Sequence, residues 1–215
     1  MGERATRRAI KPLDIEKVLP LIRMAVEEDF GDGDPTSEIS IPEDRMDRAY
    51  IVTREEIVVC GMELIKHVLK LYDERLKLRV LIEDGHRANV ANRLGVIEGP
   101  VRSMLSAERV VLNFLQRLCG ISTMTWKFVN AVRGTKAKIY DTRKTIPGWR
   151  ELEKYAVRCG GGYNHRMNLG EAVMFKDNHW TELGEKFEPR LHKMVQQAIE
   201  NPKVKYVVVE VDHVD

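Results

Sequence analysis

The stretch AKIYDTRKTIPGWRELEKYAVRCG, residues 137–160, joins a short apolar run to an amphipathic helical segment through a Pro-Gly turn. Two more short apolar runs follow, EAVMFKD at 171–177 and KYVVVEVD at 205–212, with the helical stretch LHKMVQQAIE between them. Strands that are apolar on both sides and are separated by helices are typical of a parallel sheet or an α/β barrel. We therefore predict an α/β unit with its chemistry at the carboxyl ends of the strands.

Polar and charged side chains stand at or near the ends of these three runs. They are Thr142, Arg143 and Lys144 after the first run, His165 and Arg166 before the second, Lys176 and Asp177 after the second, and Glu210 and Asp212 in the last. If the strands are neighbours, these groups converge on one rim, where like charges repel unless an anion binds among them. Taken singly, a lone Arg or Lys after a strand is usually a solvated surface charge, and a lone His is more often a hydrogen-bonded structural residue than a ligand or base. The combined pattern favours an anionic ligand.

Three consecutive glycines, Gly160 to Gly162, precede His165 and Arg166. We expect Gly160 to end the preceding helix, because glycine tolerates a left-handed conformation. Gly161 and Gly162 would let the backbone approach a ligand or a neighbouring strand, and their N–H groups beside Arg166 favour phosphate or carboxylate. A purely structural role for all three glycines is the alternative.

The N-terminal half has a different pattern. Helical spacing of apolar residues predicts a helix over residues 13–30, followed by an acidic loop. The β-like runs at 49–61, 76–85 and 92–100 enclose an amphipathic segment at 62–72. This order predicts an α+β unit with a mostly antiparallel sheet.

A long helical segment connects the two halves. We predict that Ser106 caps its start and that Gly120 lies at its far end. A domain boundary is placed near that start, which gives an N-terminal domain over 1–107 and a barrel domain over 108–215.

The composition excludes several classes of protein. Charged residues make up 32% of the 215 residues, yet the net charge is only +2, so a nucleic-acid-binding stripe is not indicated. No apolar run approaches the roughly 20 residues that span a bilayer, so no membrane partner is expected. Cys60, Cys119 and Cys159 are odd in number and lack metal-ligand spacing. They predict reduced thiols in the cytoplasm and no zinc site.

Four stretches resemble the quinolinate phosphoribosyltransferase family, also called nicotinate-nucleotide pyrophosphorylases (carboxylating). They are EDFGDGDPTS, SAERVVLNFLQRLCGIST, the block from Tyr140 to Trp180, and VVVEVD. The resemblance implies an N-terminal α/β sandwich followed by an open, TIM-barrel-like α/β barrel. Members of the family continue past the VEVD strand with further strand and helix units, so the barrel is expected to be incomplete in this chain and the sequence to be truncated at its C-terminus.

The resemblance also implies an activity. Quinolinate and phosphoribosyl pyrophosphate would give nicotinate mononucleotide, pyrophosphate and carbon dioxide, with Mg²⁺, in the de novo route to NAD. The chain would act as a homodimer or a dimer-based hexamer.

Residue roles follow from the matching positions. Lys144, Lys176 and Glu210 would be catalytic; Arg143, Lys144, Arg166 and Lys176 would bind the quinolinate carboxylates and the sugar phosphate; Thr142 and His165 would complete the pocket; Arg109 would reach the partner's site. Glu210 would lie near the ribose, where a carboxylate could also assist Mg²⁺, which is otherwise held mainly through the substrate.

Two alternatives remain open. The chain could be a non-catalytic or impaired anion-binding or assembly module of the same fold. It could also be a molybdenum-transport-associated homologue, although the intact NHR and KDNH segments favour the quinolinate enzyme.

Overall fold

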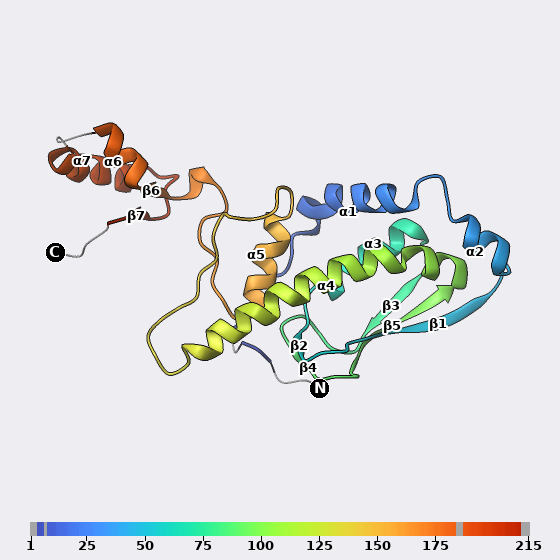
Figure 1. Cartoon of the computed structure of the whole chain (residues 1–215). Helices are drawn as coiled ribbons and strands as arrows, with labels where there is room; N and C mark the ends of the chain where they lie inside the picture. The colour runs from blue at the N-terminus through green and yellow to red at the C-terminus, as the bar shows by residue number, and fades with distance from the viewer. Residues whose placement is uncertain (1–3, 7, 184–186, 212–215) are drawn as a thin grey trace. The chain divides into compact units, whose positions relative to one another are not determined.

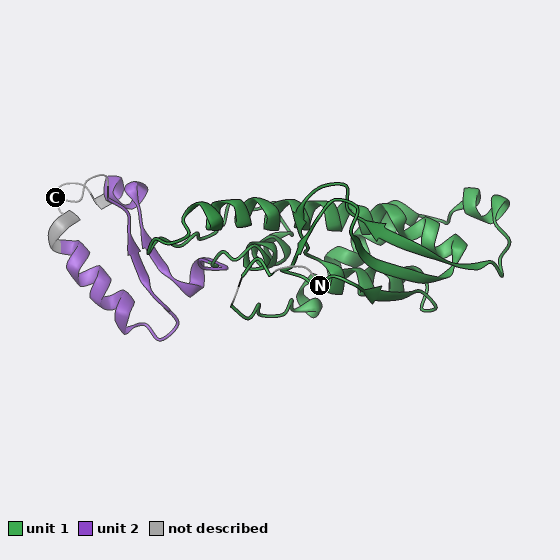
Figure 2. Cartoon of the chain, turned by 90° about the horizontal axis from the view of Figure 1, so that it is seen from below, with its two compact units in different colours: residues 1–164 green, residues 165–215 purple. Residues whose placement is uncertain are grey.

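A computed structural model describes residues 4–6, 8–183 and 187–211 (Figure 1). The chain divides into two compact units, unit 1 over Met1–Asn164 and unit 2 over His165–Asp215, which Figure 2 colours separately. Among the described helices, none is both long enough and apolar enough to cross a membrane.

Unit 1 contains the antiparallel sheet that the sequence predicts. Strands β1 (Met46–Val52), β5 (Arg93–Pro100) and β3 (Lys77–Val80) form a sheet in the order β1-β5-β3, with antiparallel pairing throughout. Strand β2 (Ile57–Val58) pairs with β4 (Arg87–Ala88) in a separate antiparallel ribbon. The prediction of an α+β unit with a mostly antiparallel sheet is confirmed.

Helices supply most of the core of unit 1. Helix α1 spans Ile15–Phe30 and α3 spans Met62–Tyr72, as the apolar spacing predicts. The short helix α2 (Pro35–Ser40) begins inside the stretch predicted as an acidic loop. Helix α5 (Arg150–Cys159) packs into the same core as α1, α3 and α4 (Val101–Ala131), which places it in unit 1.

Helix α4 is longer than predicted at both ends. It begins five residues before Ser106, whose hydroxyl donates to Asp34 Oδ2 at 2.9 Å, so Ser106 is not the N-cap. It also runs through Gly120 to Ala131. Buried residues continue past Gly120 to Thr125, and their burial outweighs the roughly 1 kcal/mol cost of a glycine inside a helix. The helix spans the predicted boundary between residues 107 and 108, and that division into domains stays a prediction.

Unit 2 is a strand-helix-strand arrangement. Strand β6 (Val173–Phe175) is followed by α6 (Asp177–Leu183) and α7 (Phe187–Glu200), and then by β7 (Val207–Val209), which pairs with β6 in parallel. A single 3₁₀ turn, Leu169–Glu171, precedes β6. Parallel strands separated by helices confirm the α/β prediction for this part of the chain, and no closed barrel forms among the described residues.

The first predicted strand of the C-terminal half is wrong. Residues 137–142 make only an isolated parallel bridge, Tyr140 to Tyr163. Asp141 N–H donates to Tyr163 O and Tyr163 N–H to Ile139 O. A single bridge gives this segment too few backbone partners to extend into a strand.

Candidate active site

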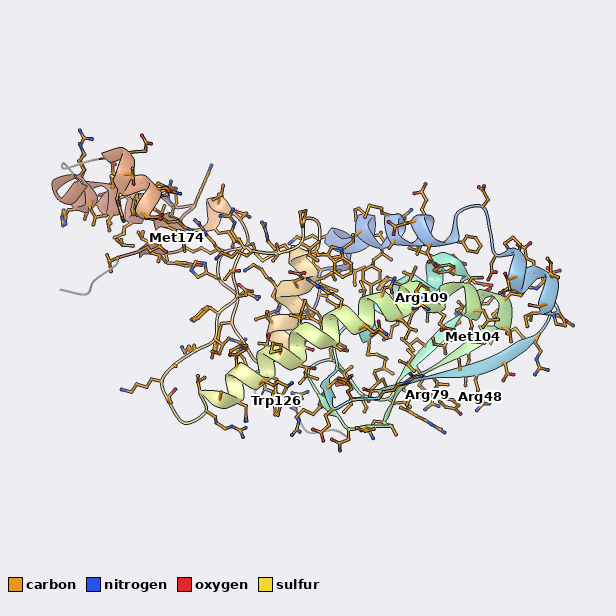
Figure 3. The ribbon with its side chains drawn as sticks, viewed as in Figure 1. Arg48, Arg79, Met104, Arg109, Trp126 and Met174 are labelled. Atoms are coloured by element: carbon orange, nitrogen blue, oxygen red, sulfur yellow. The ribbon has the colours of Figure 1, made fainter. Side chains whose placement is uncertain are left out.

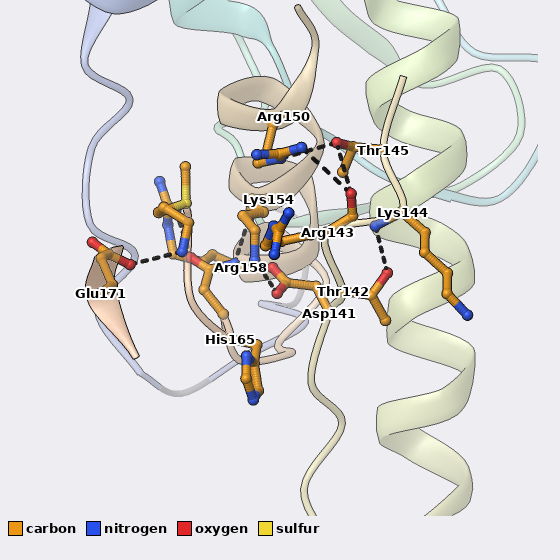
Figure 4. Close-up of polar contacts among 12 residues, drawn as sticks. Asp141, Thr142, Arg143, Lys144, Thr145, Arg150, Lys154, Arg158, His165 and Glu171 are labelled. Carbon is orange, nitrogen blue, oxygen red and sulfur yellow. Dashed lines mark hydrogen bonds and ion pairs between the residues drawn. The ribbon is translucent and has the colours of Figure 1, made fainter. Parts of the chain in front are cut away.

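The loop after this bridge carries three of the predicted site residues. Thr142 and Lys144 are exposed, and Arg143 is half-buried. Lys144 N–H donates to Thr142 Oγ1 at 3.0 Å, and Thr145 N–H donates to the Arg143 carbonyl at 2.9 Å. Arg150, the first residue of α5, donates from Nε to Thr145 Oγ1 at 3.1 Å (Figure 4). These bonds hold the loop in a compact turn against α5.

Arg143 also has an unsatisfied donor. Its Nε is buried and has no hydrogen-bond partner among the described residues. A buried donor left without an acceptor costs about 1–3 kcal/mol, and such groups in native proteins often mark the place of a ligand or water. The arrangement is therefore suited to an anionic ligand.

A buried polar network anchors this loop, and the sequence reasoning missed it. Lys154 in α5 pairs with Asp141, with 1% and 6% of their side-chain surfaces exposed. Asn164 Nδ2 donates to Asp141 Oδ2 at 2.6 Å and to the Lys154 carbonyl at 2.8 Å. Arg158 Nη1 donates to Asn164 Oδ1 at 2.7 Å. The local sequence gives no signal for this network, because Lys154 lies in a charge-rich segment, RELEKYAVRC, between Glu153 and Tyr155.

The first of the three glycines, Gly160, serves helix packing. Gly160 is the C-cap residue of α5, which confirms the prediction that it ends this helix. The left-handed conformation expected for it is wrong, since its φ is −74°; Gly161, at φ +89°, is the left-handed residue. A Cβ on Gly160 would lie 2.3 Å from the Ser122 carbonyl and 2.6 Å from Thr125 Cβ in α4. Gly160 therefore permits a close approach to a neighbouring helix, which agrees with the alternative that this glycine has a structural role.

Unit 2 brings two predicted residues together. Lys176 directly follows β6 and Glu210 directly follows β7. Phe175 pairs with Val209, and Glu210 N–H donates to the Phe175 carbonyl at 3.0 Å. Lys176 and Glu210 thus lie side by side at the carboxyl edge of the parallel pair, as predicted for strand ends. The predicted neighbour Asp212 lies outside the described residues.

The other two predicted residues of unit 2 are engaged within that unit. Arg166 is 8% exposed, and its Nη1 donates to the Ala172 carbonyl at 2.7 Å, while Nη2 lies 3.8 Å from Met174 Sδ. His165 Nδ1 lies 3.2 Å from the Tyr206 hydroxyl. The structure therefore holds both side chains in fixed positions, and their substrate-binding roles stay predictions.

Arg109 belongs to unit 1, where its side chain is exposed on α4 (Figure 3). A cavity of about 900 Å³ runs between β1 and α4; Glu108, the residue before Arg109, is part of its lining. Its lining includes the exposed side chains of Tyr50, Val52 and Leu105. Exposed apolar groups around a cavity are typical of a surface that another protein chain covers.

Both halves of the chain match models of one family. Residues 34–119 match the quinolinate phosphoribosyl transferase N-terminal domain, and residues 121–215 match its C-terminal domain. A nicotinate-nucleotide pyrophosphorylase structure from Francisella tularensis has a TM-score of 0.85 and 37% sequence identity, over 97% of this chain and 71% of that one. The chain belongs to the quinolinate phosphoribosyltransferase family.

Family members from distant organisms are similar to this chain. The probable nicotinate-nucleotide pyrophosphorylase [carboxylating] of Bacillus subtilis is 45% identical over 73% of this chain and 54% of its own length. Quinolinate phosphoribosyltransferase [decarboxylating] 1b of Nicotiana tabacum is 41% identical over 76% of this chain and 47% of its own length. The chain spans about half the length of these curated relatives.

Membership in the quinolinate phosphoribosyltransferase family accounts for the fold. The family's two domain models cover, in order, the antiparallel sheet unit and the strand-helix-strand region. The resemblance inferred from EDFGDGDPTS, the TRKT segment and the GGGYNHR segment is thereby confirmed. The individual roles of the site residues stay predictions.

Proposed function

We propose that this chain is a quinolinate phosphoribosyltransferase or a part of one. It would convert quinolinate and phosphoribosyl pyrophosphate to nicotinate mononucleotide, pyrophosphate and carbon dioxide in NAD biosynthesis. The match of both halves to the two domains of this family carries the proposal. The buried, unpartnered Nε of Arg143 supports an anionic substrate at the 142–144 loop.

The residue types suit this chemistry. The pyridine nitrogen of quinolinate attacks C1 of the ribose while the bond from C1 to pyrophosphate breaks, and positive charge develops on the sugar. The exposed Glu210 carboxylate would stabilise that charge. Once the ring nitrogen is glycosylated it is cationic, so it stabilises the electron pair left on the ring carbon when the 2-carboxylate leaves as carbon dioxide. That carbon then takes up a proton.

The cations would position the substrates. Arg143 and Arg166 offer planar, bidentate donors that match the two ring carboxylates, whereas Lys144 and Lys176 act as point charges toward phosphate. Thr142 would lie in the same contact stretch, and His165 would support the pocket. None of these side chains forms a covalent intermediate in this scheme.

Magnesium is the proposed cofactor. The Glu210 side chain is exposed, and a single accessible carboxylate suits Mg²⁺, which keeps several waters and takes few protein ligands. Bound there with the substrate, Mg²⁺ would offset the charge of the leaving pyrophosphate.

A second copy of the chain is the proposed partner. Arg109 is exposed on α4, and the same helix borders the cavity that Tyr50, Val52 and Leu105 line. An exposed arginine near an apolar surface of this kind supports an interface through which Arg109 enters the partner's site. The assembly would be a dimer or a dimer-based hexamer. The free thiols of all three cysteines are consistent with a reducing cytoplasm.

The activity is tested directly with the purified full chain. It is incubated with quinolinate, phosphoribosyl pyrophosphate and Mg²⁺, and nicotinate mononucleotide is followed by mass spectrometry, with Arg143→Ala as the matched control. We expect product from the chain and none from the variant. Loss of both product and quinolinate binding in the unmodified chain would overturn the proposal.

A non-catalytic anion-binding module is the second candidate. Unit 2 has two parallel strands among its described residues, fewer than a barrel needs. Quinolinate binding without product, abolished by Arg143→Ala, would favour this candidate.

The shared site has its own test. Arg109→Ala and Glu210→Gln variants are assayed alone and after mixing under conditions that exchange subunits. If Arg109 acts in the partner's site, each variant alone is inactive, and a mixed dimer has one site with both residues intact. Random exchange should then restore about a quarter of the normal activity. No recovery, with exchange verified, would place Arg109 outside the partner's site.

A further inference from the structure

Two cysteines and an aspartate meet in the interior of unit 1. Cys60 lies just before α3, Asp84 lies in the turn after β3, and Cys159 is the last residue of α5. Both thiols are fully buried, and the two Sγ atoms and a carboxylate oxygen of Asp84 all lie within 4.8 Å of one another. We propose that Cys60, Asp84 and Cys159 form a binding site for a thiophilic divalent cation of the Zn²⁺ class.

The donor set and its spacing suit such an ion. Zn²⁺ binds thiolate sulfur at about 2.3 Å and carboxylate oxygen at about 2.0–2.2 Å in tetrahedral geometry, which sets ligand atoms about 3.3–3.8 Å apart. The three donors already lie within 4.8 Å of one another, so small side-chain rotations close the site. Binding displaces the two thiol protons, giving two thiolates and one carboxylate around the ion.

Asp84 is oriented in the way that a metal-binding carboxylate requires. Its Oδ1 accepts from the N–H groups of Gly61 and Met62, each at 2.9 Å, at the start of α3. Its Oδ2 accepts from the Tyr155 hydroxyl at 2.7 Å. Two carboxylate oxygens offer about four lone-pair positions, so one remains for a metal. Carboxylate ligands held by outer hydrogen bonds are the usual arrangement in metal sites.

A cavity adjoins the site on the side of Asp84. It has a volume of about 720 Å³, and Asp84, Tyr155 and Met62 are part of its wall. An ion held by three protein ligands next to this cavity could take water as its fourth ligand, the pattern of open zinc sites. The wall of the same cavity carries charges of both signs, with Arg4, Arg8 and Lys66 opposed by Glu63 and Glu83.

This site is independent of the proposed function. Mg²⁺ selects oxygen ligands, whereas thiolates select soft ions such as Zn²⁺, so the proposed substrate magnesium would not occupy it. The spacing of the cysteines in the sequence predicted no zinc site. The fold brings Cys60 and Cys159 together from segments that lie far apart along the chain.

The test uses Zn²⁺ and Co²⁺ with the full chain under reducing conditions. We expect one equivalent of either metal to remain after dialysis. X-ray absorption of the Zn²⁺ form should show two sulfur ligands, and the Co²⁺ form should show thiolate-to-metal charge-transfer absorption. Failure to retain metal, or any other number of sulfur ligands, would overturn the proposal. Both measurements use the unmodified chain and so do not depend on a variant folding.

Variants then assign the ligands. Cys159→Ala should abolish the charge-transfer absorption of the Co²⁺ form, and Asp84→Asn should weaken Co²⁺ binding at least tenfold. Cys119→Ala is the matched control: Cys119 is also buried, and its Sγ accepts from Cys60 N–H at 3.3 Å, but it is not one of the three donors. Cys119→Ala should keep both the absorption and the affinity. Equal effects of Cys119→Ala and Cys159→Ala would contradict the assignment.

Discussion

Lys154 and Asp141 form an ion pair in the interior of unit 1, with 1% and 6% of their side-chain surfaces exposed. The pair connects α5 to the residue that precedes the loop carrying Thr142, Arg143 and Lys144. Charges at this depth are tolerated only when they are paired and hydrogen-bonded. The ion pair is therefore one of the interactions in the core that position the proposed substrate loop.

Removing one member of this ion pair should strongly destabilise the folded protein. Lys154→Met leaves the Asp141 charge buried without its counter-charge, which should lower the free energy of unfolding by about 3–5 kcal/mol. Urea denaturation of the full chain measures the change. The double variant with Asp141→Leu should recover much of the loss, since no isolated charge remains.

The control for this experiment is a surface pair. Lys66 and Glu63 lie 2.5 Å apart but keep 38% and 60% of their side-chain surfaces exposed. Lys66→Met should change the free energy of unfolding by less than about 1 kcal/mol. Similar losses from Lys66→Met and Lys154→Met would contradict the importance assigned to burial.

Two glycine substitutions should change the stability of the fold in opposite directions. Gly160→Ala puts a Cβ 2.3 Å from the Ser122 carbonyl in α4, and forcing the helices apart should cost about 1–3 kcal/mol or more. Gly120→Ala, inside α4 with no atom within 4 Å of the new Cβ, should stabilise by about 0.5–1 kcal/mol. The unfolding temperature of each variant shows whether the substitution stabilises or destabilises the protein. Stabilisation by Gly160→Ala would show that α4 and α5 are not packed this closely.

Asp73 should contribute to loss of stability in acid. The Arg75 guanidinium, aided by the Arg75 N–H and the Ser103 hydroxyl, holds the pKa of Asp73 well below its ordinary value. A lowered folded-state pKa stabilises the fold above the unfolded value of about 3.9, and the contribution is lost as pH falls toward the folded value. The ion pair of Asp73 and Arg75 is therefore fully effective near neutral pH.

An Asp73→Asn variant tests this pH dependence. Between about pH 6 and about pH 3 the unfolding temperature of the variant should fall less than that of the unmodified chain. The other carboxylates contribute alike to both proteins, so the difference isolates Asp73. Parallel curves over this range would contradict the prediction.

Substitutions at two of the proposed site residues should affect quinolinate binding and turnover differently. Arg143→Ala should weaken quinolinate binding by about 10–100-fold, the effect of losing a charged hydrogen bond. Glu210→Gln should leave quinolinate affinity within about twofold while lowering turnover by about 10²–10³-fold. Titration calorimetry and product formation measure the two effects. A loss of quinolinate affinity in the Glu210→Gln variant would contradict the role of Glu210 near the ribose and would assign it to quinolinate binding instead.

Local periodicity was enough to predict several elements of this protein. Helix α3 occupies the predicted residues 62–72 and α1 lies within the predicted 13–30. The antiparallel sheet and the parallel β6 and β7 also follow from apolar patterns. In each case the side chains that define the pattern are those that the element buries, so neighbouring residues contain the information. The adjacency of Lys176 and Glu210 follows from the same logic, because parallel strands end at one edge.

Only the tertiary structure decided the remaining features. Helix α4 runs through Gly120 because its buried face continues, and Gly160 is required because α5 approaches α4 closely. Two other features depend on contacts between segments distant in the chain. They are the ion pair of Lys154 with Asp141 and the proximity of Cys60 to Cys159. The sequence alone determined the family, the local elements and the residues available for chemistry. Packing determined which of those residues meet, because burial and close approach depend on the whole core.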